Sequence, residues 1–299
     1  MYACFRENLT DAVYMQSFAD IRMQAKSSVV AVVKGERGHA PVFKALDLID
    51  YKKALVGFDK VLIKVNFITD RTWDTGATTD PIVVEAIIKK LGGLPVKVYV
   101  VESDATLTSA DKAFEATGMK EMCSRNGVGW LNLRYVKDRV KLNIPGGEAV
   151  KSITVPRLVT ESAIISAAKL KTHGNTTVTL GMKNMFGLLP TKLKGRYHLK
   201  GISNVVVDIN TVLRPALTVI DGFVGMEGRG PLNGTPVQMN LIIAGTDPVA
   251  TDATACRVMG FNPYEIKHIR KAYERGIGSS EAQILGEKLE SVKRVFTQK

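Results

Sequence analysis

Apolar residues along this chain gather in short, nearly continuous runs rich in valine and isoleucine, and several of these runs end at glycine or at a charged residue. Runs of this kind are typical of strands that are buried on both faces of a sheet. The segments that predict strands are residues 27–35, 60–67, 96–103, 128–133, 139–145, 162–173, 217–222 and 236–245, with 146–156 as a hairpin-like return.

Between these runs, apolar positions recur at helical spacing and the segments carry start and stop signals. Thr79 or Asp80 precedes Pro81 and Asp247 precedes Pro248, as expected for an N-cap followed by proline in the first turn. The segments that predict helices are residues 81–91, 109–119, 175–190, 202–214, 247–259 and 262–275.

This alternation predicts the α/β class, with a mainly parallel twisted sheet, helices on both of its faces and an inserted β-hairpin region near residues 128–156. A single domain is expected over residues 27–299. Residues 1–26 are expected to be an N-terminal extension or a capping segment, and Met23 is an alternative start.

The composition is that of a soluble globular protein, with 299 residues, 45% of them apolar, and a mean hydropathy of +0.03. No run approaches the ~20 apolar residues of a membrane-spanning helix, so we expect no membrane association and a cytoplasmic location. Cys4, Cys123 and Cys256 form no CxxC pair. A disulfide framework, a zinc finger and an iron–sulfur cluster held by this chain alone are therefore excluded.

The net charge of +12 predicts attraction to anions. The densest basic cluster is residues 192–200, and the basic residues carry little of the aromatic interleaving that stacks nucleic-acid bases. We therefore expect a small anionic ligand rather than nucleic acid.

Polar residues recur at the carboxyl ends of the predicted strands, where open parallel sheets bind their ligands. Lys169, Lys171 and His173 alternate along the chain, so extended backbone would place them on one side. A predicted helix follows, whose free N–H groups favour negative charge, and Lys183 and Asn184 lie two turns into it. This pattern predicts a carboxylate or phosphate site; the alternative is a basic surface loop with a solvated histidine.

Residues 221–236 contain five glycines and predict a loop that either moves or wraps a ligand, or a structural turn. Asp221 and Glu227 in this segment could bind a metal, act as acid or base, or pair with lysines. Asp252 points either into the mouth of the sheet or to solvent, and His39 is expected in a flexible glycine-flanked loop. No GxSxG, HxH or HExxH arrangement occurs.

Five segments in order resemble the DUF362 family, bacterial and archaeal proteins of unknown function. They are residues 61–67, 78–87, 167–190, 219–237 and 244–263, within a resemblance that covers about residues 28–286. Val65 departs from the KPN motif of the family. Many members carry a ferredoxin-type iron–sulfur module, whose cysteines are missing here. By resemblance, the motif residues are Lys64, Asn66, Asp80, Lys171, His173, Lys183, Asn184, Asp221, Glu227, Asp247 and Asp252.

Two functions are compatible with these features. In the first, the chain binds a small anionic metabolite or cofactor, with a possible divalent metal and possible acid–base chemistry. In the second, it is an accessory module that docks on an iron–sulfur redox protein. For the first, the candidate catalytic residues are His173, Lys183, Asp221 and Glu227. The candidate ligand- or cofactor-binding residues are Lys64, Asn66, Lys171, Asn184, Gly228, Gly230 and Asp252.

Overall fold

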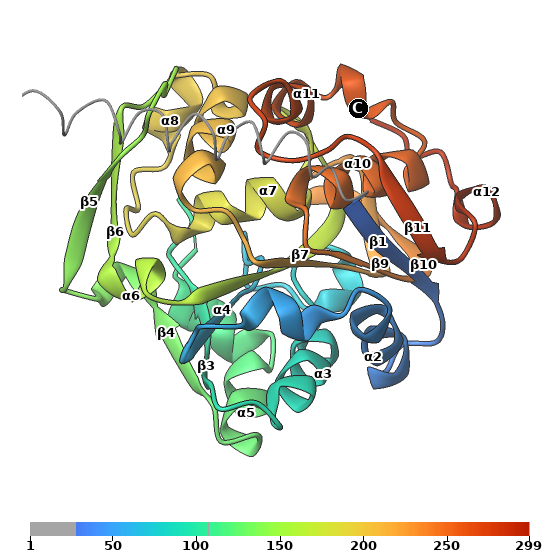
Figure 1. Cartoon of the computed structure of the whole chain (residues 1–299), viewed down its shortest axis with the longest axis horizontal. Helices are drawn as coiled ribbons and strands as arrows, with labels where there is room; N and C mark the ends of the chain where they lie inside the picture. Colours follow the sequence, from blue (N-terminus) through green and yellow to red (C-terminus); the bar gives the residue numbers. More distant parts are fainter. Residues whose placement is uncertain (1–27, 107, 299) are drawn as a thin grey trace, which may run out of the picture.

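The computed structural model describes residues 28–106 and 108–298, so the predicted extension or capping segment lies outside the described residues (Figure 1). A central sheet with the strand order β11-β1-β10-β9-β7-β2-β3-β4 organises the molecule. The strands are β1 (Ser28–Lys34), β2 (Lys60–Lys64), β3 (Lys97–Glu102), β4 (Gly129–Asn132), β7 (Ala163–His173), β9 (Leu217–Arg229), β10 (Asn233–Gly245) and β11 (Ala282–Gly286); the short β8 (Thr177–Val178) pairs with β7.

Most neighbouring strands of this sheet are parallel, which confirms the predicted class. The exception is β10, which runs antiparallel to both β9 and β1. A short turn joins β9 to β10, and such a turn can only produce an antiparallel pair. The strands β9, β7, β2 and β3 are parallel neighbours, so their carboxyl ends meet at one edge of the sheet.

Helices cover both faces of the sheet, as predicted (Figure 1). The helices are α2 (His39–Leu48), α3 (Pro81–Leu91), α4 (Ala110–Ala116), α5 (Met119–Arg125), α6 (Arg157–Thr160), α7 (Leu180–Asn184), α8 (Gly195–Leu199), α9 (Ile202–Val212), α10 (Pro248–Val258), α11 (Lys267–Glu274) and α12 (Leu289–Val292).

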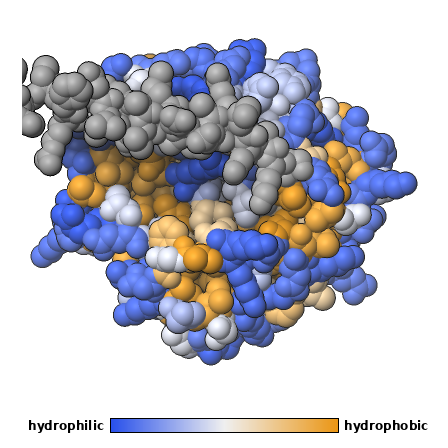
Figure 2. All heavy atoms as spheres, in the orientation of Figure 1, coloured by the Kyte–Doolittle hydropathy of each residue, from blue (hydrophilic) through white to orange (hydrophobic). Residues whose placement is uncertain are grey.

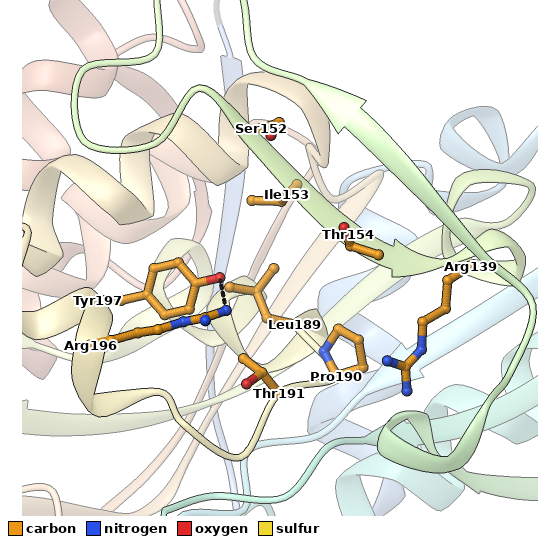
Figure 3. A pocket seen from close by; sticks show the side chains of 9 residues that line it. All are labelled: Arg139, Ser152, Ile153, Thr154, Leu189, Pro190, Thr191, Arg196 and Tyr197. Carbon is orange, nitrogen blue, oxygen red and sulfur yellow. Dashed lines mark hydrogen bonds between the residues drawn. The ribbon is translucent and has the colours of Figure 1, made fainter.

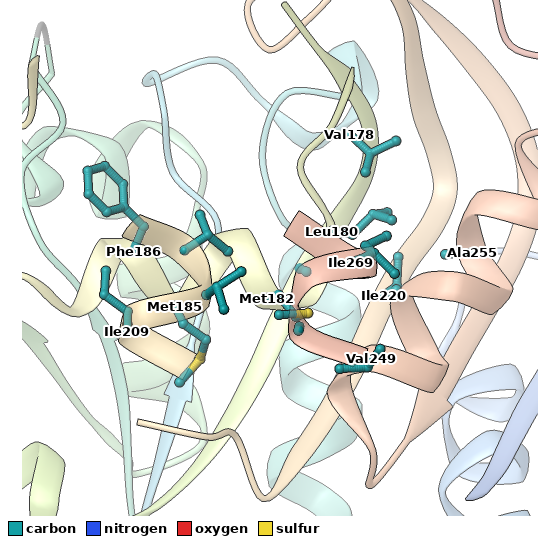
Figure 4. Close-up of a cluster of buried hydrophobic side chains, with 14 of the residues drawn as sticks. Val178, Leu180, Met182, Met185, Phe186, Ile209, Ile220, Val249, Ala255 and Ile269 are labelled. Carbon is teal, nitrogen blue, oxygen red and sulfur yellow. The ribbon is translucent and has the colours of Figure 1, made fainter. Parts of the chain in front are cut away.

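Two hydrophobic cores result, one on each face. Alternate residues of β1 enter different cores, since Val30 and Val32 pack with α7, α9, α10 and α11, while Ala31 and Val33 pack with α2 to α5. Figure 4 shows the first core, in which Met182 of α7 lies among side chains that include Val249 of α10. Helix α7 is therefore held from several sides, and the polar residues that it carries are fixed in place.

The predicted caps are confirmed at the starts of α3 and α10. The carboxylate of Asp80 accepts the N–H of Ile82 at 3.0 Å, and that of Asp247 accepts the N–H groups of Val249 and Ala250. Proline follows each cap, as its fixed φ favours the first helical turn.

The predicted hairpin near residues 128–156 divides into two parts. Strand β4 is the edge of the central sheet, and β5 (Arg139–Asn143) and β6 (Ser152–Pro156) form a separate antiparallel pair. The turn of this pair is held by buried Asp208 of α9, whose carboxylate accepts the backbone N–H groups of residues 148–150.

The predicted glycine-rich loop is wrong, because residues 221–229 continue β9 and residues 233–236 begin β10. Glycine is needed here for close packing of backbone rather than for motion. A Cβ at Gly225 would lie 2.8 Å from the carbonyl oxygen of Leu170 on the neighbouring strand. A mobile loop would contain the same small residues. Only the pairing of β9 with β7 shows that these glycines belong to a closely packed hairpin and not to a loop.

Two further expectations are corrected. The basic residues Lys169, Lys171 and His173 lie within β7 and are buried, so they form no solvated surface loop. His39 begins α2 instead of lying in a flexible loop, and its Nε2 lies 2.8 Å from Glu85. Across the described ranges, no helix has the length and apolar character needed to cross a membrane.

Candidate functional site

A cavity of about 110 Å³ opens where the carboxyl ends of β2, β3 and β7 meet. Each strand contributes its last residue, Lys64, Glu102 and His173 respectively. The rest of the wall comes from the segments that follow β2 and β3 (residues 66–68 and 105–106), from helix α7 and the 3-10 turn η4 (Met185–Leu188), and from Lys194 and His198. The position agrees with the general rule for open parallel sheets.

A buried ion pair forms the floor of the cavity. Lys64 Nζ lies 2.8 Å from Glu102 Oε2, and both side chains are almost fully buried. Glu102 also accepts the backbone N–H groups of Phe67 and Ser103. Burial lowers the pKa of Lys64, while the charge of Glu102 opposes that shift. The carboxylate is therefore fully engaged in holding the ends of β2 and β3 together.

Two asparagines connect this ion pair to α7. Asn184 Oδ1 accepts hydrogen bonds from Lys64 Nζ at 3.2 Å and from Asn66 Nδ2 at 3.0 Å. Its Nδ2 donates to the carbonyl oxygen of Lys64 and to Ser166 Oγ. Asn66 Oδ1 is buried next to the cavity and has no hydrogen-bond partner among the described residues, so it is an acceptor without a donor.

Two more lysines line the cavity, and no carboxylate pairs with either within residues 28–106 and 108–298. Lys194 Nζ lies 2.7 Å from Ser103 Oγ, whereas Lys183 Nζ has no hydrogen-bond partner in the same ranges. Burial and the nearby ammonium groups of Lys194 and Lys64 lower the pKa of Lys183 to about 8. Burial likewise lowers the pKa of Lys194 to about 8.

Two imidazoles complete the basic surface. His173 and His198 stack nearly parallel with ring centroids 6.5 Å apart, and both line the cavity. Nδ1 of His173 accepts the backbone N–H of Asn175 at 3.1 Å, which places the proton of the neutral ring on Nε2. Burial and the charges of Lys183 and Lys171 lower the pKa of His173 to about 2, so the ring is neutral near pH 7.

The N–H groups at the start of α7 do not point at a ligand. The buried carboxylate of Asp252 accepts the N–H of Gly181 and that of Met182, each at 2.8 Å. The protein thus supplies its own acceptor at the helix end where the sequence predicted a ligand. Burial raises the pKa of Asp252 to about 7, and the two N–H bonds oppose that rise. Asp252 points neither to solvent nor into the cavity, and it positions α7.

Lys171 and Lys169 also have partners inside the protein. Lys171 Nζ donates to the carbonyl oxygen of Ala77 at 2.5 Å, and burial together with the Lys183 charge lowers its pKa well below the usual value. Lys169 Nζ lies 2.7 Å from Asp221 Oδ2, and both side chains are completely buried. Both nitrogens are therefore engaged inside the protein and do not reach the cavity.

Asp221 belongs to a network that ties β7 and β9 to the start of α3. Besides Lys169, its Oδ2 accepts the backbone N–H of Asp80 at 2.8 Å. Asp80 in turn forms a two-pronged ion pair with Arg37, which stacks on the ring of Trp73. None of these residues lines the cavity. This contact set assigns Asp221 a role in joining strands.

The remaining candidates lie on the β9–β10 hairpin, against the C-terminal segment. Glu227 pairs with Arg294 at 3.1 Å and accepts the N–H of Thr297. The N–H of Gly228 donates to the carbonyl oxygen of Thr297, and Gly230 follows in the turn. The structure therefore brings together Lys64, Asn66, His173, Lys183 and Asn184 at the cavity, but not Lys171, Asp221, Glu227, Gly228, Gly230 or Asp252.

From the sequence, Glu102 is recognised only as a polar residue at the end of a predicted strand, and the cavity now assigns it to the same edge as Lys64. Lys194 and His198 are not predicted as site residues. Lys194 and His198 lie in the basic cluster 192–200, and only the path of the chain after η4 shows that they face the cavity.

A second, larger cavity of about 250 Å³ lies between β6 and residues 189–197 (Figure 3). Its two cationic side chains are held by neutral oxygens. Arg139 donates to backbone carbonyls of residues 134 and 136, and Arg196 Nη2 lies 3.3 Å from the hydroxyl of Tyr197. This cavity lacks the converging strand ends and the unpaired lysine of the first.

Replacing Gly187 by alanine tests how closely the 3-10 turn covers the ion pair. The added Cβ would lie 2.5 Å from Lys64 Cε and 2.7 Å from Glu102 Oε1. We expect the free energy of unfolding to fall by about 1–3 kcal/mol in chemical denaturation. Gly93→Ala is the control, because nothing lies within 4 Å of its new methyl group. Equal stability of the two variants would contradict the packing described.

The part of the chain that forms the cavity wall also matches a known protein family. Residues 61–257 match the family model described as a domain of unknown function, DUF362. A thylakoid-associated protein of Synechocystis sp. is 27% identical over 242 residues, which cover 76% of this chain and 71% of that protein. No match is found among solved structures. Because the family model matches residues 61–257, which are more than half of the chain, this chain belongs to the DUF362 family.

Proposed function

We propose that this cavity binds a small anionic metabolite or cofactor through a carboxylate or phosphate group. The observation that carries the proposal is that Lys183 has no hydrogen-bond acceptor among the described residues. Its ammonium lines the cavity without an acceptor among the described residues, and Lys64, Lys194 and two imidazoles share the same walls. A partly buried cation without a partner is costly, and an anion would supply the missing partner.

The size and polarity of the cavity limit the ligand. A volume of about 110 Å³ accommodates a small molecule or the head group of a larger one. The free Oδ1 of Asn66 calls for a donor, such as a hydroxyl of the ligand or a protonated phosphate oxygen. The neutral ring of His173 can donate from Nε2. The preferred ligand is therefore an anion that also carries a hydrogen-bond donor.

Acid–base chemistry at His173 depends on the bound anion. A negative charge beside the ring opposes the effect of the lysines and raises the pKa of His173. Because Nδ1 already accepts the N–H of Asn175, the ring takes up a proton only if that hydrogen bond breaks, and in the resting site it acts as a hydrogen-bond donor through Nε2. In this proposal Lys183 and His173 contact the ligand, whereas Asp221 and Glu227 have structural roles. The iron–sulfur partner, the divalent metal and the cytoplasmic location stay predictions.

Binding of inorganic phosphate to the full chain, measured by calorimetry, tests the proposal. Lys183→Met should weaken binding by about 30-fold, because one hydrogen bond to a charged group contributes roughly 1.5–3 kcal/mol. Lys200→Met is the matched control, since this exposed lysine lies in the adjacent basic stretch outside the cavity wall. Equal affinity of the two variants would contradict the assignment of the site.

The pH dependence gives an independent check. The pKa values of Lys183 and Lys194 are lowered to about 8, so both lose their charge as the pH rises through that value. Phosphate affinity should therefore fall from pH 7.5 to pH 9, and constant affinity over that range would oppose a lysine-based site.

A further inference from the structure

The lysines around the cavity differ in what they contact. The ammonium of Lys64 pairs with Glu102, that of Lys171 donates to the carbonyl of Ala77, and that of Lys194 lies against Ser103. Lys183 has no such contact in the described ranges, and its side chain reaches the cavity from the last turn of α7. Lys183 is therefore the lysine of this group whose nitrogen is free to form a bond with a ligand.

We propose that Lys183 forms an imine with the carbonyl carbon of a small anionic aldehyde or ketone, such as an oxo-acid. This inference rests on the proposed function, because the anionic group of the ligand would be held by Lys194, whose ammonium donates to Ser103 and keeps two further N–H donors, while its carbonyl lies at Lys183. The three N–H donors of Lys64 are taken by Glu102, Asn184 and the carbonyl of Val65, so Lys64 donates no hydrogen bond to the ligand.

The surroundings of Lys183 increase the fraction of the neutral amine, which is the nucleophilic form, while below pH 8 most of the side chain stays the ammonium that binds an anion. Removal from water and the like charges of Lys194 and Lys64 both disfavour the ammonium, which is how amine nucleophiles are generally activated. At pH 8 the neutral fraction would exceed that of an unperturbed lysine on the order of 100-fold, given a pKa of about 8. Glu102 cannot restore the charge, because it is committed to Lys64 and to two backbone N–H groups.

Imine formation needs only the amine of Lys183, the carbonyl of the ligand and hydrogen-bonding groups of the cavity wall. The lone pair of Nζ attacks the carbonyl carbon, a C–N bond forms, and the oxygen takes up a proton as the nitrogen loses one. The hydroxyl then leaves as water together with the second proton of the nitrogen, the C–O bond breaks, and the C=N bond remains. Nε2–H of His173 is positioned on the cavity wall to donate a hydrogen bond to the oxygen as it gains charge, and Asn66 Oδ1 can accept from its hydroxyl form. Neither an oxidant nor a reductant is needed.

Reductive trapping of the full chain tests this inference. The protein is incubated at pH 8 with glyoxylate and sodium cyanoborohydride, and carboxymethylated lysines are located by peptide mass spectrometry. Lys183 should be labelled at least about tenfold faster than Lys53, which is largely exposed and whose pKa is raised by its bond to Asp50. Inorganic phosphate should suppress labelling of Lys183 and leave Lys53 unchanged.

A charge-preserving variant separates imine formation from anion binding. Lys183→Arg keeps the cation but has no amine that forms an imine, so it should retain phosphate binding within about fivefold and lose the selective label. If the wild-type protein binds phosphate but labels Lys183 no faster than Lys53, the imine is refuted and the anion site stands. If the wild-type protein fails to bind phosphate, the proposed function itself is overturned.

Discussion

Replacing Asp221 by alanine should lower the free energy of unfolding by about 3–5 kcal/mol. The substitution leaves the ammonium of Lys169 completely buried without a counter-charge. It also removes the acceptor of the backbone N–H groups of Asp80 and Phe223. Denaturation by urea, followed by circular dichroism, measures the loss.

Two comparisons make this expectation specific. Glu227→Ala should cost only about 1 kcal/mol or less, because Arg294, its partner, is half exposed. The double variant Lys169→Met with Asp221→Leu should recover much of the lost stability, since apolar side chains can replace a buried ion pair. An Asp221→Ala protein that is as stable as the wild type but no longer binds phosphate would return Asp221 to the binding site.

Acidification should destabilise the protein steeply through two buried imidazoles. Burial is the main cause that lowers the pKa of His173 to about 2 and that of His268 to about 3. The unfolded chain, whose histidines titrate near 6.5, therefore binds more protons below that pH than the folded chain. Stability is complete above pH 6.5 and falls as the pH decreases toward 3. From pH 6 to pH 5 we expect the two imidazoles together to cost about 2 kcal/mol, and Asp252, whose pKa is raised by burial to about 7, to offset roughly half of that loss because it binds its proton more tightly in the folded chain.

His268→Leu separates the two contributions. Both ring nitrogens of His268 are buried without a hydrogen-bond partner among the described residues, so leucine removes a polar group at little cost. Between pH 6 and pH 5 this variant should lose about 1 kcal/mol less stability than the wild type, which is the contribution of one histidine. Ile269→Val, a core change at the next residue with no titrating group, should keep the full dependence. A full dependence in His268→Leu would show that this ring already titrates normally.

Much of the fold could be predicted because local signals and the global architecture agree. The caps Asp80 and Asp247 stand where the structure uses them, and the valine-rich runs became the parallel strands. The errors arose where one composition suits two structures. The glycines of residues 221–236 satisfy both a mobile loop and a closely packed hairpin, and pairing with β7 decides between them.

In the candidate site, too, some features could be predicted from the sequence and others depend on the tertiary structure. The sequence by itself determined the strand ends and the side chains that they carry, so Lys64 and His173 were found from position alone. Which acidic group meets which lysine was decided only by the tertiary structure. Asp221 neutralises Lys169 and Asp252 occupies the start of α7, whereas Lys183 is left without a partner in the described ranges. Pairing depends on distances of a few ångströms between residues far apart in the chain, and sequence spacing carries no information about such distances.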